Sequence, residues 1–452
     1  MAALSRRSFL ARSSVAAGGV MALGAAACSG DDGDGDGATG DGAVGDTSAQ
    51  AFDPTDWASV RDQFPLDPEV AHFAAFVLAA HPRPVAEAVE RHRAGLDADT
   101  HAYLASTEQD ADAAVRDAAA EYLGGTPAEV GLTDSTTMGL GLLYGGLRVR
   151  PDQEVLTTEH DFFSTHQAWA LRSAASGTAV RRVRLYDDPA AATVDEIVGR
   201  LVAGVTPATR VVAITWVHSG TGVKLPVRAI ADALAPLSDG RSPDDAILLC
   251  VDGVHGLGAE ATPVSDLGCD FLVAGTHKWL FGPRGTGIVW GRASAWPVVS
   301  PAVPAFEPSS FGEWSAGLPP APTDGLRFTP GGYHSFEHRW ALAEAFRFHL
   351  DIGRDQVAAR TAAQATRLKA GLAETAGVRR VTPAAEELSA GIVCFDVDGQ
   401  DPPAVVAALA GQGIATSVTP YADAHVRAGP SIVTTPVQVD ALVAAVAAIA
   451  RR

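Results

Sequence analysis

Short apolar runs alternate with helical patterns over much of this chain, and this alternation constrains its fold more than any other feature. Apolar strands separated by helices are typical of a mostly parallel sheet that helices cover on both faces. The predicted strands cover residues 129–133, 154–157, 180–185, 211–216, 247–251, 271–274 and 287–290. We therefore predict an α/β protein whose large domain contains a mostly parallel seven-stranded sheet.

The alternation fades after about residue 296, where a proline-rich crossing segment begins. The pattern then predicts one long helix over 338–373, strands at 391–397, 414–418 and 431–434, and helices at 403–412 and 436–450. This order is typical of a small α+β domain. We assign residues 51–105 to an N-terminal segment that packs with the small domain, 106–300 to the large domain, and 301–452 to the crossing segment and the small C-terminal domain.

The first 50 residues have the pattern of an export signal and a tether. Residues 5–10 are a twin-arginine pattern, and the apolar stretch 14–27 is too short and too weakly apolar for a stable membrane span. Small residues precede Cys28, which predicts a signal peptide over 1–28 and a lipid anchor at Cys28; a chance cysteine near an ordinary cleavage site is the alternative. Residues 29–50 are rich in Gly and Asp, as in a flexible linker. We expect export by the twin-arginine route, to a membrane-anchored or periplasmic location.

Charge and cysteine content exclude some classes of protein. The formal net charge is −19, which makes nucleic acid an unfavourable partner. Beyond Cys28, the chain has Cys250, Cys269 and Cys394, each in or beside an apolar run, as buried thiols are. We therefore predict neither a disulfide framework nor a metal site.

A lysine stands where a protein can fix a reactive amine. Lys278 follows the apolar run 271–274 and the pair Thr276-His277, and it precedes a loop rich in Gly and Pro. An amine held at a sheet edge can form a Schiff base with an aldehyde cofactor such as pyridoxal phosphate. Taken alone, a solvated or ion-paired lysine is the commoner explanation of this position.

Pyridoxal phosphate also needs a carboxylate for its ring nitrogen and a flat group on its ring face. Asp252 closes the apolar run 247–251, and a carboxylate at the end of a parallel strand points into the crevice where ligands bind. His255, three residues on, could bond the phenolic oxygen of the ring. His160 follows the strand at 154–157 and could lie over the ring. Alone, Asp252 could be a turn residue and His160 a surface histidine.

The phosphate needs an anion cradle. Ser135, Thr136 and Thr137 lie between a predicted strand and the start of a helix near Thr136. Hydroxyls and free N–H groups at a helix N-terminus bind phosphate well, although an ordinary N-cap has the same pattern.

The segments 252–256 and 270–280, and the spacing from Asp252 to Lys278, resemble the class V aminotransferase family, which includes cysteine desulfurases and isopenicillin N epimerase-like proteins. The resemblance extends from about Phe52 to the C-terminus. It implies the pyridoxal phosphate-dependent fold type I, and homodimers with active sites at the interface. It assigns the Schiff base to Lys278 and the ring nitrogen to Asp252. The remaining cofactor contacts that it implies are His160 on the ring face, Thr136 and Thr137 at the phosphate, His255 near the phenolic oxygen, Thr276 and His277 at the phosphate, and Ser219 in the facing loop 219–222.

Two further segments resemble parts of the family. Arg427, in 425–430, matches the arginine that holds the substrate carboxylate, a task that suits the bidentate guanidinium. A surface ion pair is the alternative for this arginine. Residues 331–337 stand where the family contributes a loop to the neighbouring active site, but their pattern departs from the usual form.

The resemblance implies a reaction through an external aldimine with an amino-acid-type substrate, with Lys278 as the base for the α-proton. Transamination, epimerisation and C–S elimination all remain open, and we favour an aminotransferase-type assignment. A persulfide-forming desulfurase needs a cysteine on a mobile loop, whereas Cys394 lies in an alternating apolar run. A cofactor-free exported binding lipoprotein is the hypothesis from another class, and the combination of Lys278, Asp252 and His160 argues against it.

Overall fold

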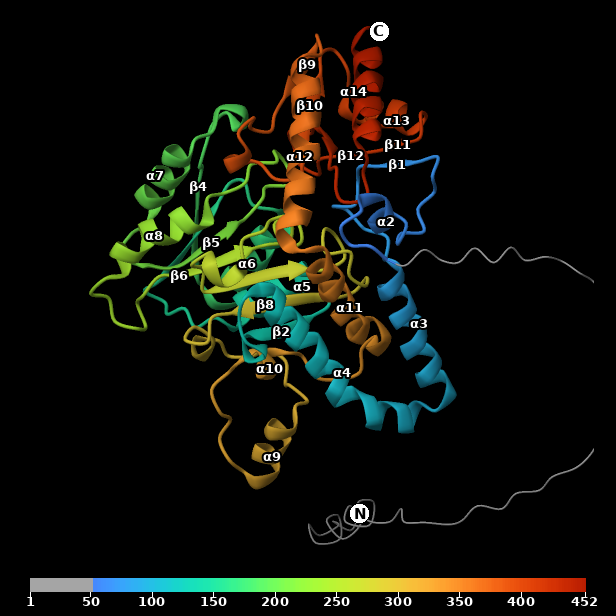
Figure 1. Cartoon of the computed structure of the whole chain (residues 1–452). Coiled ribbons are helices and arrows are strands. Elements are labelled where there is room, and N and C mark those ends of the chain that lie inside the picture. Colours follow the sequence, from blue (N-terminus) through green and yellow to red (C-terminus); the bar gives the residue numbers. More distant parts are fainter. Residues whose placement is uncertain (1–51) are drawn as a thin grey trace, which may run out of the picture. The chain divides into compact units, whose positions relative to one another are not determined.

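In the computed structural model of this protein, the structure describes residues 52–452 (Figure 1). The second of two compact units starts at Ala51 and contains all of them. The predicted signal peptide, the lipidation at Cys28 and the linker at 29–50 lie outside the described residues. Within the described part, we find no helix with the length and apolar character needed to cross a bilayer.

A seven-stranded sheet forms the centre of the large domain, as predicted. Its order is β2-β8-β7-β6-β5-β3-β4, and only β8 runs antiparallel to its neighbours. The strands are β2 (Val130–Thr133), β3 (Glu154–Thr158), β4 (Ala179–Val183), β5 (Thr209–Thr215), β6 (Leu248–Asp252), β7 (Phe271–Gly275) and β8 (Gly287–Gly291). Each lies within two residues of its predicted range. All of these strands except the partly exposed edge strand β4 are largely buried, and buried strands have apolar runs that are easy to locate.

Both faces of this sheet are buried. In β5, Val212 and Ile214 belong to one hydrophobic cluster, while Val211 and Ala213 belong to another. Successive side chains of a strand point to opposite faces, so the sheet separates two cores. The helices packed around it are α3 (Arg83–Ala98), α4 (Thr100–Leu123), α5 (Thr136–Gly146), α6 (Phe163–Ser176), α7 (Val194–Gly204), α8 (Val227–Ser238), α10 (Gly325–Phe328) and α11 (Phe336–Ile352).

The small domain has its own antiparallel sheet, of order β12-β13-β10-β9. Its elements are β9 (Val378–Arg380), β10 (Val393–Val397), β12 (Ser417–Val418), β13 (Val426–Ala428), α12 (Arg354–Ala373), α13 (Pro402–Ala410) and α14 (Pro436–Ala450). The N-terminal segment adds β1 (Ala71–His72), which pairs in parallel with β11 (Ile414–Ala415). The helices α12 and α14 contact each other and lie side by side in Figure 1.

Two predicted elements of this region were wrong. The long helix at 338–373 is two helices, α11 and α12, because Gly353 between them has a φ of 92°, a conformation that ends a helix and favours glycine. Residues 431–434 form a turn closed by a 3.1 Å bond from Ser431 N to Thr434 Oγ1. The strand in this part of the chain that pairs with β10 is β13, which ends just before Gly429 and Pro430, and Pro430 has no N–H to donate to a sheet.

The crossing segment carries a short helix, α9 (Pro308–Ala316), on a long loop that projects beyond α10 in Figure 1. Several large apolar side chains on this loop are exposed, among them Phe306, Phe311 and Trp314. The N-terminal segment also contains a short helix, α2 (Trp57–Arg61).

Candidate active site

A cavity of about 320 Å³ lies at the carboxyl ends of the central strands. Such an edge is where α/β proteins bind their ligands. The side chains around it come from both domains: Phe76, Val77, Ser135, Thr136, Thr137, Phe162, Ser164, Thr215, Ser219, Asp252, Val254, His255, His277, Lys278, Pro420 and Arg427. It therefore brings together Lys278, Asp252 and Arg427, which are up to 175 residues apart in the sequence (427 − 252).

Asp252 is the last residue of β6 and is almost fully buried. One carboxylate oxygen, Oδ1, accepts a 3.1 Å bond from Val254 N. Burial raises the pKa of Asp252, and the Val254 bond and the charge of Lys278 oppose this rise. The carboxylate can therefore accept a proton, or a hydrogen bond from a protonated nitrogen, in the cavity.

Lys278 follows β7 by three residues and shares the cavity with Asp252. Burial, assisted by the charge of Arg427, lowers the pKa of Lys278 to about 8, against the opposite effect of Asp252. The chain has two other lysines, and both are occupied: Lys224 pairs with Glu260 at 2.9 Å, and Lys369 bonds Ser389 at 2.6 Å. Within the described residues, Lys278 is thus the one lysine whose amine forms no hydrogen bond.

The turn after Lys278 is strained. Phe281 has a φ of 57°, the only positive φ at a non-glycine residue in the described chain. Its N–H bonds the carbonyl of Lys278 at 3.0 Å, and its ring packs edge-on against Phe64. Strain of this kind persists only where the surroundings hold it, and it is common at functional sites. The turn therefore fixes the backbone that carries the amine.

The predicted phosphate cradle is the first turn of α5. Ser135 is its N-cap, since Ser135 Oγ accepts a 3.1 Å bond from Met138 N. Thr136 Oγ1 accepts a 2.7 Å bond from Gly275 N and so ties this turn to the end of β7. The first N–H groups of a helix have no partner inside the helix, and here they lie beside the cavity. The ordinary capping role therefore holds for Ser135, and an anion site is compatible with it.

A hydrogen bond from Trp279 fixes the tautomer of His255. Trp279 Nε1 donates to His255 Nδ1 at 3.2 Å, so the proton of the neutral ring is on Nε2. Burial, with Lys278 and Arg427 nearby, places the pKa of His255 well below its usual range. The residue is therefore a neutral donor in the wall of the cavity. It suits an oxygen acceptor such as a phenolic oxygen.

The two residues before Lys278 differ in position. His277 lines the cavity, and its buried Nδ1 has no partner among the described residues. Thr276 does not line it, because its hydroxyl bonds that of Thr286 within the turn. Thr276, which is predicted to hold the phosphate, thus has no direct contact with the cavity.

His160 lies away from this cavity, although the sequence placed it over the ring. Its Nε2 accepts a 3.1 Å bond from Leu185 N, and its ring stacks on Tyr186 with centroids 3.9 Å apart. Burial lowers the pKa of His160 to about 4. Phe162, two residues later, reaches the cavity instead.

Arg427 enters the cavity from β13 in the small domain and is 7% exposed. Its Nε donates to Ser417 Oγ at 3.0 Å, and Nη1 donates to the Ser219 carbonyl at 3.2 Å. The guanidinium also lies 4.6 Å from the centre of the Phe76 ring. Arg427 forms no ion pair with any described residue, so the surface ion pair considered above is not its role. A buried arginine without an anionic partner can bind a carboxylate.

Ser219 lines the cavity and connects the two domains. Its hydroxyl bonds the Tyr421 hydroxyl at 2.8 Å, while its carbonyl accepts from Arg427. The neighbouring Gly220 leaves room for Tyr421, since a Cβ there would lie 2.9 Å from the tyrosine ring.

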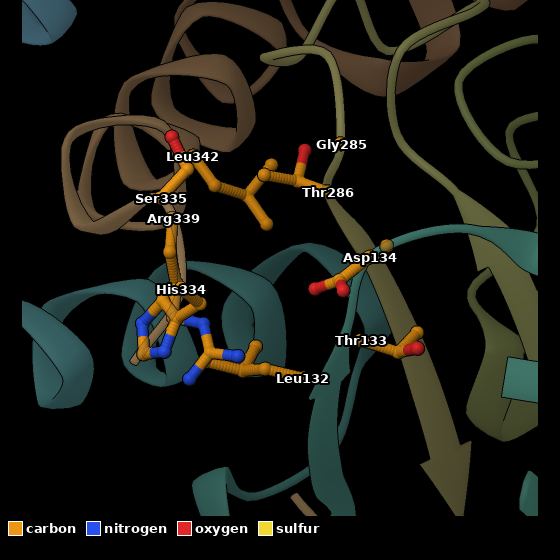
Figure 2. A pocket seen from close by; sticks show the side chains of 10 residues that line it. Leu132, Thr133, Asp134, Gly285, Thr286, His334, Ser335, Arg339 and Leu342 are labelled. Carbon is orange, nitrogen blue, oxygen red and sulfur yellow. The ribbon is translucent and has the colours of Figure 1, made fainter. Parts of the chain in front are cut away.

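The loop at 331–337 lies outside the cavity of its own chain. His334 and Ser335 line a second cavity of about 10 Å³, with room for one water molecule. Figure 2 shows Asp134 reaching into it from the segment after β2, across from His334 and Arg339. Arg339 is 8% exposed, and its guanidinium has no hydrogen-bond partner among the described residues.

The side chains of the larger cavity fit pyridoxal phosphate. They include the free amine of Lys278, the carboxylate of Asp252 with one oxygen that accepts no hydrogen bond, and the neutral donor His255. The N-terminus of α5 also lies beside the cavity. The sequence did not single out Phe76, Phe162, Thr215 or Val254. Thr215 could have been found, because it ends β5 opposite Asp252 and its Oγ1 is buried without a partner in the described chain. Nothing in the local sequence marks Phe76.

Comparison with known proteins gives the same family. The model of the family described as Aminotransferase class-V matches residues 79–442. Isopenicillin N epimerase of Streptomyces clavuligerus is 27% identical over 352 residues, covering 75% of this chain and 84% of the relative. A probable cysteine desulfurase of Streptomyces coelicolor is 25% identical over 419 residues, covering 86% and 96%.

Solved structures share the fold. A complex of the cystine C-S lyase C-DES with cysteine persulfide has a TM-score of 0.74 at 22% identity and covers 85% of this chain and 99% of that one. The cysteine desulfurase CsdA of Escherichia coli has a TM-score of 0.72 at 21% identity, covering 86% and 97%. These likenesses confirm the predicted fold type I. With most of its length matched, this chain belongs to the class V aminotransferase family of pyridoxal phosphate-dependent enzymes.

Proposed function

We propose that this enzyme removes the α-proton of an amino acid whose carboxylate is bound by Arg427. The observation that carries the proposal is one cavity that holds the free amine of Lys278, the carboxylate of Asp252 and the unpaired guanidinium of Arg427. The three groups match the three needs of the reaction: a base, a partner for the ring nitrogen and a carboxylate clamp.

Each group has a distinct task. Bound pyridoxal phosphate supplies an aldehyde and an electron-accepting ring. Asp252 would face the ring nitrogen and hold its proton, while His255 would donate from Nε2 to the phenolic oxygen. Lys278 would hold the cofactor and carry the proton from the substrate's Cα, and its lowered pKa leaves much of the amine neutral near pH 8. Arg427 would orient the substrate through its carboxylate.

Among the possible outcomes, we propose epimerisation or C–S elimination ahead of transamination. The relatives named above as an epimerase, a C-S lyase and desulfurases support this order, and none is named as an aminotransferase. A persulfide-forming cysteine is not supported: Cys394 is fully buried in β10, outside the cavity, and burial raises its pKa to about 12.

An absorption spectrum of the full-length protein with pyridoxal phosphate tests the proposal. We expect a visible band from the lysine-bound cofactor; its absence would favour a cofactor-free binding protein. Incubation with a panel of amino acids then separates the reactions. Inversion at Cα indicates an epimerase, pyruvate with sulfide indicates C–S elimination, and pyridoxamine phosphate indicates transamination.

We also propose a homodimer, a state that the family resemblance implies. Exposed apolar side chains support an interface, since Trp314 is 80% and Tyr333 is 87% exposed. Sedimentation of the purified enzyme at several concentrations tests this, and a monomer at all of them would contradict it.

Export and lipid anchoring rest on residues 5–28 of the sequence. We propose that the enzyme is exported by the twin-arginine route and anchored through Cys28. Cell fractionation tests both: changing Arg6 and Arg7 to Lys should retain the protein inside the cell, and Cys28→Ala should release it from the membrane.

A further inference from the structure

The loop between β3 and α6 is fixed on both sides of its central residues. Asp161 Oδ2 accepts bonds of 2.7 Å from Thr157 Oγ1 and from Thr158 N. His160 is held by Leu185 N and by the ring of Tyr186. These contacts turn the imidazole away from the cavity and bring the next aromatic side chain, Phe162, into its wall.

Phe162 is the N-cap residue of α6 and is partly buried. Its ring meets that of Tyr421 edge-on, with centroids 6.0 Å apart. Tyr421 is itself held by the Ser219 hydroxyl. The phenyl ring is thus supported from the small domain as well as by its own loop.

The other rings in the cavity wall have other positions. Phe76 lies 4.6 Å from the guanidinium of Arg427. His255 and His277 belong to the segments that carry Asp252 and Lys278, at the ends of the neighbouring strands β6 and β7. If Asp252 binds the nitrogen of the pyridoxal phosphate ring and Lys278 its aldehyde, these segments would contact the ring along its edge. Another element would then have to cover the face of the ring, and β3, which leads to Phe162, is such an element.

We infer that Phe162, and not His160, covers the ring face of pyridoxal phosphate in this enzyme. The inference rests on the proposed function, because it takes the cofactor to be held between Asp252 and Lys278. Offset stacking of two flat rings is favourable beyond the apolar area that it buries. A phenyl ring has no titratable proton, so this wall holds the cofactor without exchanging protons with the substrate.

The test is the dissociation constant of pyridoxal phosphate, measured by titrating full-length apoenzyme and following the visible band and its circular dichroism. Phe162→Ala should weaken binding about 10-fold and reduce the dichroism of the band. Phe162→Tyr, which keeps a ring, should stay within about 3-fold of the wild type. Phe162→Leu, which keeps apolar volume without a ring, gives a second measurement if the alanine variant does not fold.

Two matched variants serve as controls. Phe163 is the same residue type one position on, is 66% exposed and does not line the cavity, so Phe163→Ala should leave the constant unchanged. His160→Ala should lower the thermal stability but leave the constant of the folded protein within about 2-fold, because His160 packs on Tyr186 and does not line the cavity.

The inference is overturned if His160→Ala weakens binding as much as Phe162→Ala, or if both Phe162→Ala and Phe162→Leu bind like the wild type. Both outcomes differ from a failure of the proposed function. In that case the wild type itself shows no visible band.

Discussion

The two walls of the active site are built in different ways. The large-domain wall, made of Asp252, His255 and Lys278, stands at the ends of adjacent strands of one sheet. The small-domain wall, made of Pro420, Tyr421 and Arg427, is held by contacts with Ser219 of the large domain and with Phe76 of the N-terminal segment. The buried sheet thus positions the groups proposed to hold the cofactor, whereas contacts with the small domain position the groups proposed to bind the substrate.

The largest expected effect is on the large-domain wall. Lys278→Ala should abolish the visible band and lower kcat by about 10²- to 10⁴-fold or more, because it removes the anchor and the base together. The spectrum and steady-state kinetics measure both. Lys224→Ala is the control, since Lys224 pairs with Glu260 outside the cavity. A band that survives in Lys278→Ala would move the cofactor to another lysine.

A change in the small-domain wall should act on the substrate alone. Arg427→Ala should raise KM for the amino acid by at least about 30-fold, since a buried charge partner of the carboxylate is lost. The visible band should remain. Arg367→Ala, which removes an exposed ion pair with Asp440, should change neither quantity. Loss of the band in Arg427→Ala with KM unchanged would break the distinction between the walls.

Asp252→Asn separates charge from shape within the large-domain wall. The amide keeps the shape of the carboxylate but cannot support a protonated ring nitrogen by charge. We expect kcat to fall by about 10- to 100-fold, the value of a charged hydrogen bond, while KM changes little. Kinetics with one amino acid measure this. An unchanged kcat would mean that the ring nitrogen does not need its proton.

The pH dependence of cofactor loading tests the electrostatics of the same wall. Burial lowers the pKa of Lys278 to about 8, so half of the amine is in its neutral, nucleophilic form at pH 8, and this fraction falls about tenfold for each pH unit well below that value. The rate at which apoenzyme binds pyridoxal phosphate should rise up to about pH 9 and then level off. A rate that continues to rise towards pH 10 would indicate an ordinary, solvated amine.

The smallest effect is expected at the contact between the walls. Tyr421→Phe removes only the bond to the Ser219 hydroxyl, worth about 1 kcal/mol. We expect KM to rise about 2- to 5-fold, with the spectrum unchanged. Measured KM and spectra check this, and an effect on kcat alone would place Tyr421 in the chemistry.

Much of the large-domain wall could be predicted from sequence, because a strand end is easy to locate and its position at the sheet edge follows from the strand. Asp252 ends an apolar run and Lys278 follows another, and the structure places both in one cavity. The same reasoning did not locate the side chain of His160, which is not among the residues that line the cavity. Which of its side chains enters the cavity depends on Leu185, Tyr186 and Asp161, and the local pattern does not contain these contacts.

By itself, the sequence determined the α/β class, the seven central strands and the family, and it located Lys278 after one of these strands, because periodic burial and short motifs are local properties. The tertiary structure decided which side chains meet. It turned His160 towards Tyr186, placed Phe162 in the cavity wall and set Arg427 under Phe76 and beside Ser219. These positions depend on packing between segments far apart in the chain, and such packing forms only when the whole core is assembled.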